Sequence, residues 1–565
     1  MRLTQSISLA AILTLPGLAA SAAGPADKAT ALSRQTSPPA APTIQVYSRE
    51  TVVDVIVTDA DGKPVHGLKQ SDFTVKEDGK EQPIRSFRET GSATPAAVQA
   101  APPKLPTGVY TNAHAAPASG PVNIILLDIK HTRWQDRPYQ KQATITFLKT
   151  MPQGTQVAIF GLTGRLSLLQ GFTSDGAVAA AIVEAFYESL VKQTVPVGTA
   201  LSDSDLADMV NHIAAYVAGI RGRKNLMWFA GPIPISCHAT DQGLAELFDQ
   251  LMAAQVAVYP LDARGLFNDP GSPGFSLANP PKAITESTGA SAANAGMQFL
   301  METGCHMLGM EAVAEVTGGV AYYNNNDLRS QIAKVVDQGN HYYTLTYAPP
   351  PFANDARYHS IHIEVDRPGL HLTYRKGFAA EDPTKPPPSS GPQLMKAAMG
   401  PGVPPSTQLL FDVKVEPSNE PENPFDPPVL GLLDARFKKA PLARYRFLFA
   451  IPVSQIAFAD APGGNHSGSL EFDVAAYDPG GKLATLRSQT MKLPLTKEEY
   501  EQFVKTPFQF FQQLDLPPGQ MTLRIGILDG ISNKVGTLEI PLTVPKNQAQ
   551  RAAAQPTPTG PDDLK

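Results

Sequence analysis

The sequence predicts an α/β fold: a doubly wound domain in the middle of the chain, with β domains on both sides of it. Three observations lead to this prediction. Apolar strands alternate with amphipathic helices over 121–347, a period-two pattern precedes them at 44–90, and period-two strands return after residue 341. Apolar strands that alternate with helices indicate a mostly parallel sheet covered on both faces, whereas strict alternation indicates antiparallel β structure.

Six strands are expected in the central part, at residues 122–128, 156–162, 166–172, 225–231, 256–262 and 319–323. Apolar residues recur at helical spacing between them, as at Leu206, Met209 and Val210. The connection from Gly161 to Arg165 is short, so the second and third strands are expected to form an antiparallel hairpin at one edge of the sheet.

The N-terminal β unit carries two hairpin-turn signals, Asp61-Gly62 and Asp78-Gly79. It is too short to be stable alone, so we expect it to pair with strands at 341–378, with the α/β domain inserted between the two pieces. The expected boundaries are a signal peptide at 1–22, a flexible leader at 23–43, the β unit at 44–90, a linker at 91–120, the α/β domain at 121–347, a β hairpin completing the β unit at 348–378, a Pro-rich linker at 379–407, a C-terminal β-sandwich at 408–545 and a disordered tail at 546–565.

The N-terminus has the layout of a secretory signal. Arg2 supplies positive charge, residues 7–15 form a short apolar core, and Ala-Ser-Ala at 20–22 fits the cleavage pattern. No later stretch is apolar for long enough to span a bilayer. We therefore expect a secreted or periplasmic protein with no transmembrane segment after signal cleavage. The net charge of −5 gives no electrostatic reason to expect nucleic acid as a partner.

Export exposes the two cysteines, Cys237 and Cys305, to an oxidising environment. A disulfide between them is the leading interpretation. A histidine follows each cysteine, so a zinc site made of Cys237, His238, Cys305 and His306 is the alternative. It is disfavoured, because adjacent residues point in different directions and the spacing is unusual for zinc ligands.

The carboxyl ends of the strands identify the candidate binding edge, because open α/β sheets bind ligands there. The first strand, VNIILLD, ends at Asp128, and Lys130, Thr132 and Trp134 follow it. Asp262 closes the fifth strand. Three further sequence features of this edge are Arg264 just beyond Asp262, the Gly/Pro-rich loop at 265–295, and Ala230-Gly231-Pro232 in place of an acid after the fourth strand.

Several segments in order resemble an exported bacterial family of von Willebrand factor type A-related proteins. They are DVIVTDADGKPVHGLKQSDFTVKEDGKEQPIRSF ahead of the α/β domain, FTSD at 172–175, VYPLDARGL at 258–266, EVTGGVAYYNNNDL at 315–328, and YYTLTYAPP with the hairpin that follows it. The resemblance spans about residues 45–378, and the C-terminal region resembles the tail of longer members. It implies architecture more than activity.

The resemblance maps the ligands of a divalent-cation site onto Asp128, position 130 and Thr132, with a later threonine such as Thr199 and an acid after the fourth strand. Mg²⁺ requires near-octahedral oxygen coordination. Lys130 offers no oxygen, and Gly231-Pro232 stands where the acid is expected. The implied metal site is therefore degenerate, and we expect no cofactor. Binding of Mg²⁺ by Asp128 and Thr132 is the less favoured alternative. Lys130 either forms an ion pair with Asp128 in place of the cation or points to solvent.

No Gly-x-Ser-x-Gly, His-Glu-x-x-His or phosphate-loop motif occurs in the sequence. We expect a non-enzymatic binding protein that contacts a protein partner or the cell envelope through an edge made of Lys130, Trp134, Asp262 and Arg264. Two alternatives stay open: divalent-cation-dependent adhesion, and an unrecognised hydrolase that uses Asp128 and Asp262.

Overall fold

The computed structural model describes residues 50–91, 105–113, 122–191, 203–231, 233, 235–264, 290–349, 355–380, 390–418 and 429–546. The expected signal peptide and leader, most of the loop at 265–295, Thr199, and all but the first residue of the expected tail lie outside this set. No helix in the described part of the chain is long and apolar enough to cross a membrane.

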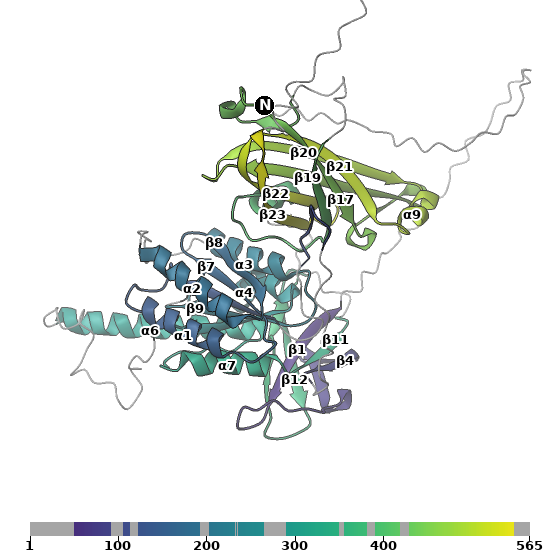
Figure 1. Ribbon diagram of the computed structural model, residues 1–565. Coiled ribbons are helices and arrows are strands. Elements are labelled where there is room, and N and C mark those ends of the chain that lie inside the picture. Colours follow the sequence, from purple (N-terminus) through teal and green to yellow (C-terminus); the bar gives the residue numbers. More distant parts are fainter. Residues whose placement is uncertain are drawn as a thin grey trace, which may run out of the picture. The chain divides into compact units, whose positions relative to one another are not determined.

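The α/β domain contains a five-stranded sheet in the order β10-β9-β6-β7-β8 (Figure 1). Its strands are β6 (Val122–Asp128), β7 (Val157–Leu162), β8 (Leu166–Thr173), β9 (Lys224–Ala230) and β10 (Val256–Asp262). β10, β9, β6 and β7 run parallel, and β8 pairs antiparallel with β7 at one edge, as the short connection predicts.

Helices cover both faces of this sheet. They are α1 (Arg137–Thr150), α2 (Gly176–Val191), α3 (Asp203–Val217), α4 (Asp241–Ala253), α6 (Ala290–Thr317) and α7 (Leu328–Gly339). Ile124 and Leu126 of β6 join a core with α3, α4 and α6, whereas Ile125 and Leu127 join a core with α1, α2 and α7. Alternate residues of one strand point to opposite faces, so β6 is buried from both sides.

The sixth expected strand, at 319–323, is wrong. Only one β-bridge forms there, between Leu261 and Tyr322. The chain leaves α6 through Gly318, which has a φ of 81°. A Cβ atom on Gly319 would then lie 1.9 Å from the carbonyl oxygen of Val258. The backbone therefore meets β10 at close range, and glycine is required there.

The N-terminal β unit combines two distant pieces of the chain. Its strands are β1 (Thr51–Thr58), β2 (Phe73–Glu77), β3 (Lys80–Gln82), β4 (Ile84–Thr90), β11 (Tyr342–Tyr347), β12 (Tyr358–Val365), β13 (His371–Thr373) and β14 (Gly377–Ala379). They form two four-stranded sheets, ordered β13-β1-β11-β4 and β14-β12-β2-β3. Each sheet pairs strands from before the α/β domain with strands from after it, and both contribute to one core.

The C-terminal region contains a four-stranded sheet, β21-β17-β15-β5, and a larger sheet, β16-β20-β19-β22-β23, with β18 paired to β19. The elements are β5 (Val109–Thr111), α8 (Gly391–Ala398), β15 (Asp412–Pro417), β16 (Leu432–Leu433), β17 (Ala443–Ile451), β18 (Ala459–Ala461), β19 (Asn465–Tyr477), β20 (Leu483–Leu495), α9 (Lys497–Phe503), β21 (Phe508–Leu516), β22 (Gly519–Asp529) and β23 (Val535–Val544). The two sheets contribute side chains to one core.

Both expected linkers contain regular structure. The stretch at 91–120 supplies β5, which pairs with β15, and the stretch at 379–407 supplies α8. β5 is only three residues long, and α8 lies beside three consecutive prolines in the sequence. Such short elements are stable only through their tertiary partners. The local composition does not reveal those partners, so it predicts a linker.

Asp473 is expected to make the stability of the C-terminal region depend on pH. Burial raises the pKa of this carboxyl to about 6, and Oδ1 has no hydrogen-bond partner among the described residues. Because the pKa of Asp473 is higher in the folded than in the unfolded chain, the protonated carboxyl favours the folded state. This stabilisation is fully present below the unfolded pKa of about 4 and is lost as the pH rises through about 6, where the buried carboxyl ionises. Asp473→Asn is therefore expected to stabilise by about 2 kcal/mol at about pH 8, with no gain at about pH 4.

Urea unfolding of the full chain at the two pH values measures this effect. The matched control is Asp412→Asn, an exposed aspartate on β15, which is expected to change stability by less than about 0.5 kcal/mol. An equal gain from Asp473→Asn at both pH values would show that titration of Asp473 is not the cause.

Candidate functional site

Asp128 closes strand β6 and is the centre of a buried hydrogen-bond network. Its side chain is fully shielded from solvent. The backbone N–H of His131 donates to Oδ1 at 3.0 Å, and the indole Nε1 of Trp228 donates to Oδ2 at 3.0 Å. Nδ1 of His131 lies 2.9 Å from Oδ1 and 2.8 Å from Oδ2. Three donors therefore converge on one carboxylate, and hydrogen bonds to a charged acceptor are stronger than neutral ones.

These contacts fix the tautomer of His131. An ionised carboxylate only accepts hydrogen bonds, so Nδ1 of His131 must carry the hydrogen. Nε2 is buried and has no hydrogen-bond partner within the described part of the chain. The imidazole is thus oriented by Asp128 through one nitrogen, while the other is the unpaired polar atom of the network.

Trp228 reaches Asp128 because of the strand register. β6 and β9 run parallel, with Leu126 opposite Trp228. Residues two apart on a strand share a face, so Asp128 follows Leu126 on the face where the indole is buried. The N–H of a buried tryptophan needs an acceptor, and the Asp128 carboxylate supplies it.

The loop between β6 and α1 is held by further polar contacts. The hydroxyl of Thr132 donates to the carbonyl oxygen of Asp128 at 2.5 Å, and Nε of Arg137 donates to the carbonyl oxygen of Thr132 at 3.2 Å. Nε2 of Gln140, on α1, donates to the carbonyl oxygen of Phe229 on β9 at 2.9 Å. The loop is therefore connected to both the first helix and the neighbouring strand.

This loop presents three consecutive exposed side chains. Arg133, Trp134 and Gln135 are exposed, and Trp134 keeps 70% of its surface accessible. They follow directly after His131 and Thr132, which are buried. The Trp134 ring is thus exposed on a loop whose backbone is held by the hydrogen bonds of Thr132 and Arg137.

Asp262, at the end of β10, has its own cationic partner. Arg264 Nε donates to Oδ1 at 2.9 Å, and Arg264 Nη2 donates to Oδ2 at 2.6 Å. Burial raises the pKa of Asp136, the charges of Arg133 and Arg264 offset part of that shift, and the charge of Asp262 adds to it. The end of β10 and the β6–α1 loop are therefore within electrostatic reach of each other.

Both expectations for Lys130 are wrong. Among the described residues, the basic partner of Asp128 is His131 and not Lys130. Lys130 does not extend into solvent either, because only 9% of its surface is accessible. The backbone N–H groups of Ile129 and Lys130 both donate to the carbonyl oxygen of Leu162, at 2.9 and 3.1 Å. This turns the chain so that residue 131, rather than residue 130, faces the carboxylate.

Gly231 follows the fourth strand of the prediction, where the resemblance expects an acid. A Cβ atom at this position would lie 2.6 Å from the carbonyl oxygen of His131. That distance leaves no room for a side chain while the β6–α1 loop keeps its conformation. An acidic side chain at position 231 is therefore incompatible with the observed position of the His131 backbone.

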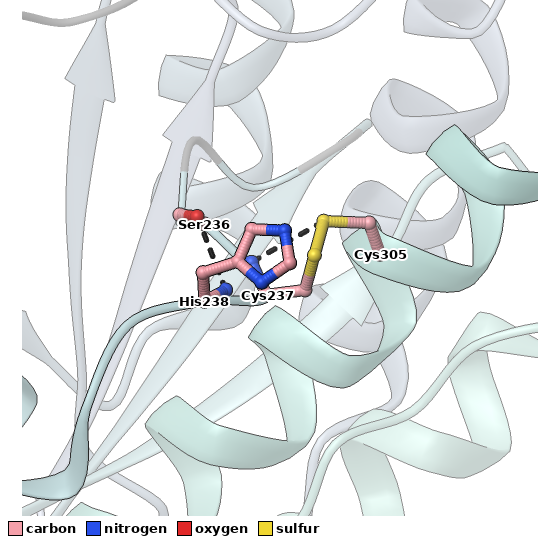
Figure 2. Close-up of a disulfide and its surroundings, with 4 residues drawn as sticks. All are labelled: Ser236, Cys237, His238 and Cys305. Carbon is pink, nitrogen blue, oxygen red and sulfur yellow. Dashed lines mark hydrogen bonds between the residues drawn. A yellow bond between two sulfur atoms is a disulfide. The ribbon is translucent and has the colours of Figure 1, made fainter. Parts of the chain in front are cut away.

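Cys237 and Cys305 form a disulfide, with their Cα atoms 4.8 Å apart (Figure 2). Cys237 belongs to the segment after β9, and Cys305 lies on α6. Two sulfur atoms bonded to each other are not available as thiolate ligands. The alternative zinc site with His238 and His306 is therefore not formed in this structure.

Sequence reasoning gave neither His131 nor Trp228 a role in the site. His131 stands among the residues after Asp128, but a histidine three residues beyond a strand end has no fixed direction until the turn is known. Trp228 lies 100 residues from Asp128 in the chain. Only the parallel register of β6 and β9 brings the two side chains together.

No protein-family model matches the sequence, and no curated protein matches it. Solved structures do align with part of the chain. An aerotolerance-related membrane protein from Bacteroides fragilis aligns at 16% identity and a TM-score of 0.25, covering 39% of this chain and 98% of its own. BatB from Bacteroides thetaiotaomicron aligns at 16% identity and a TM-score of 0.24, with the same coverages.

A von Willebrand factor type A protein from Catenulispora acidiphila aligns at 12% identity and a TM-score of 0.23, covering 67% of each chain. At such scores and identities, neither a partner nor an activity can be transferred from these proteins to this chain.

Proposed function

We propose that this chain is an exported, non-enzymatic binding protein. Its central domain, of the von Willebrand A type, recognises a protein partner at the carboxyl-end edge of its sheet and needs no divalent cation to do so. The single observation that carries the proposal is that His131 and Trp228 already hydrogen-bond both oxygens of the Asp128 carboxylate. An edge whose central carboxylate is already satisfied does not need a metal ion for stability.

The oxygen atoms of this edge support a cation-independent mechanism. Both carboxylate oxygens of Asp128 accept hydrogen bonds, and the Thr132 hydroxyl is committed to a backbone carbonyl. Position 130 is a lysine and position 231 a glycine, so neither supplies a carboxylate or hydroxyl oxygen. Mg²⁺ binds proteins through one or two carboxylates together with several waters, and both oxygens of the Asp128 carboxylate are already hydrogen-bonded.

The same contacts argue against the hydrolase alternative. General acid–base catalysis by two carboxylates requires both to reach a substrate. Asp128 is fully shielded, and Asp262 is 1% accessible and held by Arg264 through two hydrogen bonds. These carboxylates act instead as structural acceptors that fix the surrounding loops.

Trp134 is the side chain that we expect to contact the partner. Tryptophan and arginine are the residues most enriched where alanine substitution strongly weakens protein–protein binding. Trp134 and its neighbour Arg133 are both exposed on the fixed β6–α1 loop. A pre-organised loop loses little conformational entropy on binding, which favours affinity.

Site-specific photo-crosslinking tests the proposal. A benzophenone amino acid at position 134 of the full chain is expected to crosslink a protein in a cell-envelope extract of the producing organism, equally with Mg²⁺ and with EDTA. The matched control is position 432, because Leu432 is similarly exposed at 75% but lies on β16 in the C-terminal region. No specific crosslink is expected there.

Two outcomes would contradict the proposal. A crosslink at position 134 that disappears with EDTA would favour cation-dependent adhesion. Equal crosslinking from positions 134 and 432 would show that the β6–α1 loop is not a specific contact surface.

A further inference from the structure

A second cluster of chemically active side chains belongs to the N-terminal β unit and shares no residue with the edge described above. Glu77 ends β2, Asp78 follows it in the turn to β3, and His359 lies on β12. β2 and β12 pair antiparallel, with Glu77 opposite Ile361, so the end of one strand lies beside the start of the other. One ligand atom from each of the three residues lies within 4.8 Å of the others.

His359 is oriented by a carboxylate on each side. Nδ1 lies 2.8 Å from Oδ2 of Asp78 and 4.0 Å from Oε1 of Glu77. Nε2 lies 3.0 Å from Oδ1 of Asp355, and the ring stacks on Phe378 at 5.3 Å between centroids. Metal-binding histidines commonly donate their second nitrogen to a carboxylate, which fixes the tautomer and the ring direction. Asp355 is placed for that role.

Glu77 provides an independent indication. Only 4% of its surface is accessible, and Oε2 accepts a hydrogen bond from the Tyr347 hydroxyl at 2.7 Å. Oε1 accepts no hydrogen bond from any described residue, and it is the oxygen nearest His359 Nδ1. The second oxygen of this largely buried side chain is therefore free to accept a cation on the side of His359.

We propose that Glu77, Asp78 and His359 bind one divalent transition-metal ion, with Zn²⁺ as the best match. The ion takes the place of the hydrogen between His359 Nδ1 and Asp78, and the displaced proton passes to solvent. Imidazole nitrogen and carboxylate oxygen are both zinc ligands, and three protein ligands leave a fourth position for water. Ca²⁺ is a poor match, because it takes oxygen ligands only.

The distances suit this ion after small shifts. Tetrahedral zinc with ligands at about 2.0–2.2 Å separates them from one another by about 3.4 Å, which lies between the two distances from His359 Nδ1 to the carboxylates of Asp78 and Glu77. Asp78 and His359 are 281 residues apart in the sequence. A bound ion would therefore connect β2, which precedes the α/β domain in the chain, to β12, which follows it.

Calorimetric titration of Zn²⁺ into the metal-free full chain tests the proposal. We expect one site that Glu77→Gln and His359→Gln each weaken at least about 10-fold, while Asp355→Asn weakens it about 10- to 100-fold. His362→Gln is the matched control. It lies on the same strand, its side chain is 64% exposed, and its partner is Glu364, so the affinity should not change.

Circular dichroism and thermal melting check that each variant is folded, and Zn²⁺ should raise the melting temperature of the parent chain but not that of Glu77→Gln. No Zn²⁺ binding to the parent chain would overturn the proposal and leave the cluster as a set of ion pairs. Binding that survives both Glu77→Gln and His359→Gln would also overturn it, because the ion would then lie elsewhere.

Discussion

Asp128→Ala is expected to lower the free energy of unfolding of the α/β domain by about 3–5 kcal/mol. The substitution removes the acceptor for three donors: two from His131 and one from Trp228. All of these donors are buried, so water does not replace the lost acceptor without rearrangement. An unpaired buried donor costs about 1–3 kcal/mol, and more when its partner was charged.

Urea unfolding of the full chain, followed by tryptophan fluorescence, measures this loss. The signal reports on the network directly, since Trp228 is one of only two tryptophans in the chain. Asp337→Ala is the control, because Asp337 is an exposed aspartate on α7 of the same domain, and it should change stability by less than about 0.5 kcal/mol. A loss below about 1 kcal/mol from Asp128→Ala would show that the network contributes little.

The same variant connects stability to the proposed binding surface. Without Asp128, His131 loses the contact that orients its ring, and the β6–α1 loop loses its central anchor. Trp134 would remain exposed but on a less ordered loop, so its crosslinking should fall although the residue itself is unchanged. Loss of crosslinking with the domain still folded would separate this pre-organisation from simple unfolding.

The sequence predicts the position of Asp128 better than its environment. A run of apolar residues that ends in an acid is a local signal, and β6 has the predicted bounds, 122–128. The partner of that acid depends instead on the turn after the strand and on the register with β9. The expected ion pair of Lys130 assumes that the next charged residue pairs with Asp128. That assumption fails because the turn at residues 129–130, whose backbone N–H groups donate to the carbonyl oxygen of Leu162, brings His131 to the carboxylate instead.

Distance along the chain limits prediction of the second cluster in the same way. Asp78-Gly79 is recognisable as a turn, and the three-residue spacing of His359 and His362 places them on opposite faces of a strand. Nothing local indicates that the turn and the histidine meet. Four strands within 408–545 were also missed: β16, β18, β20 and β21. β16 and β18 are only two and three residues long. The segments of β20 and β21, LATLRSQTMKLPL and FQFFQQLDL, contain glutamine or lysine and show weaker apolar alternation than their neighbours.

Removal of the disulfide is expected to have the second largest effect on the α/β domain. Cys237 and Cys305 are 68 residues apart, and a crosslink over such a loop typically contributes about 2–4 kcal/mol, largely by restricting the unfolded chain. The double variant Cys237→Ser, Cys305→Ser should lose this amount in urea unfolding. Dithiothreitol should destabilise the parent chain by a similar amount and leave the double variant unchanged.

The native state should tolerate this loss better than the loss of Asp128. The disulfide connects the segment after β9 to α6, and it takes no part in the hydrogen bonds that fix the β6–α1 loop. Crosslinking from position 134 should therefore persist in the reduced chain at temperatures where the domain is still folded. If reduction abolished the crosslink without unfolding, the binding edge would extend from the β6–α1 loop to the segment after β9, and Gly231, which packs against the backbone of His131, would be the point of contact between them.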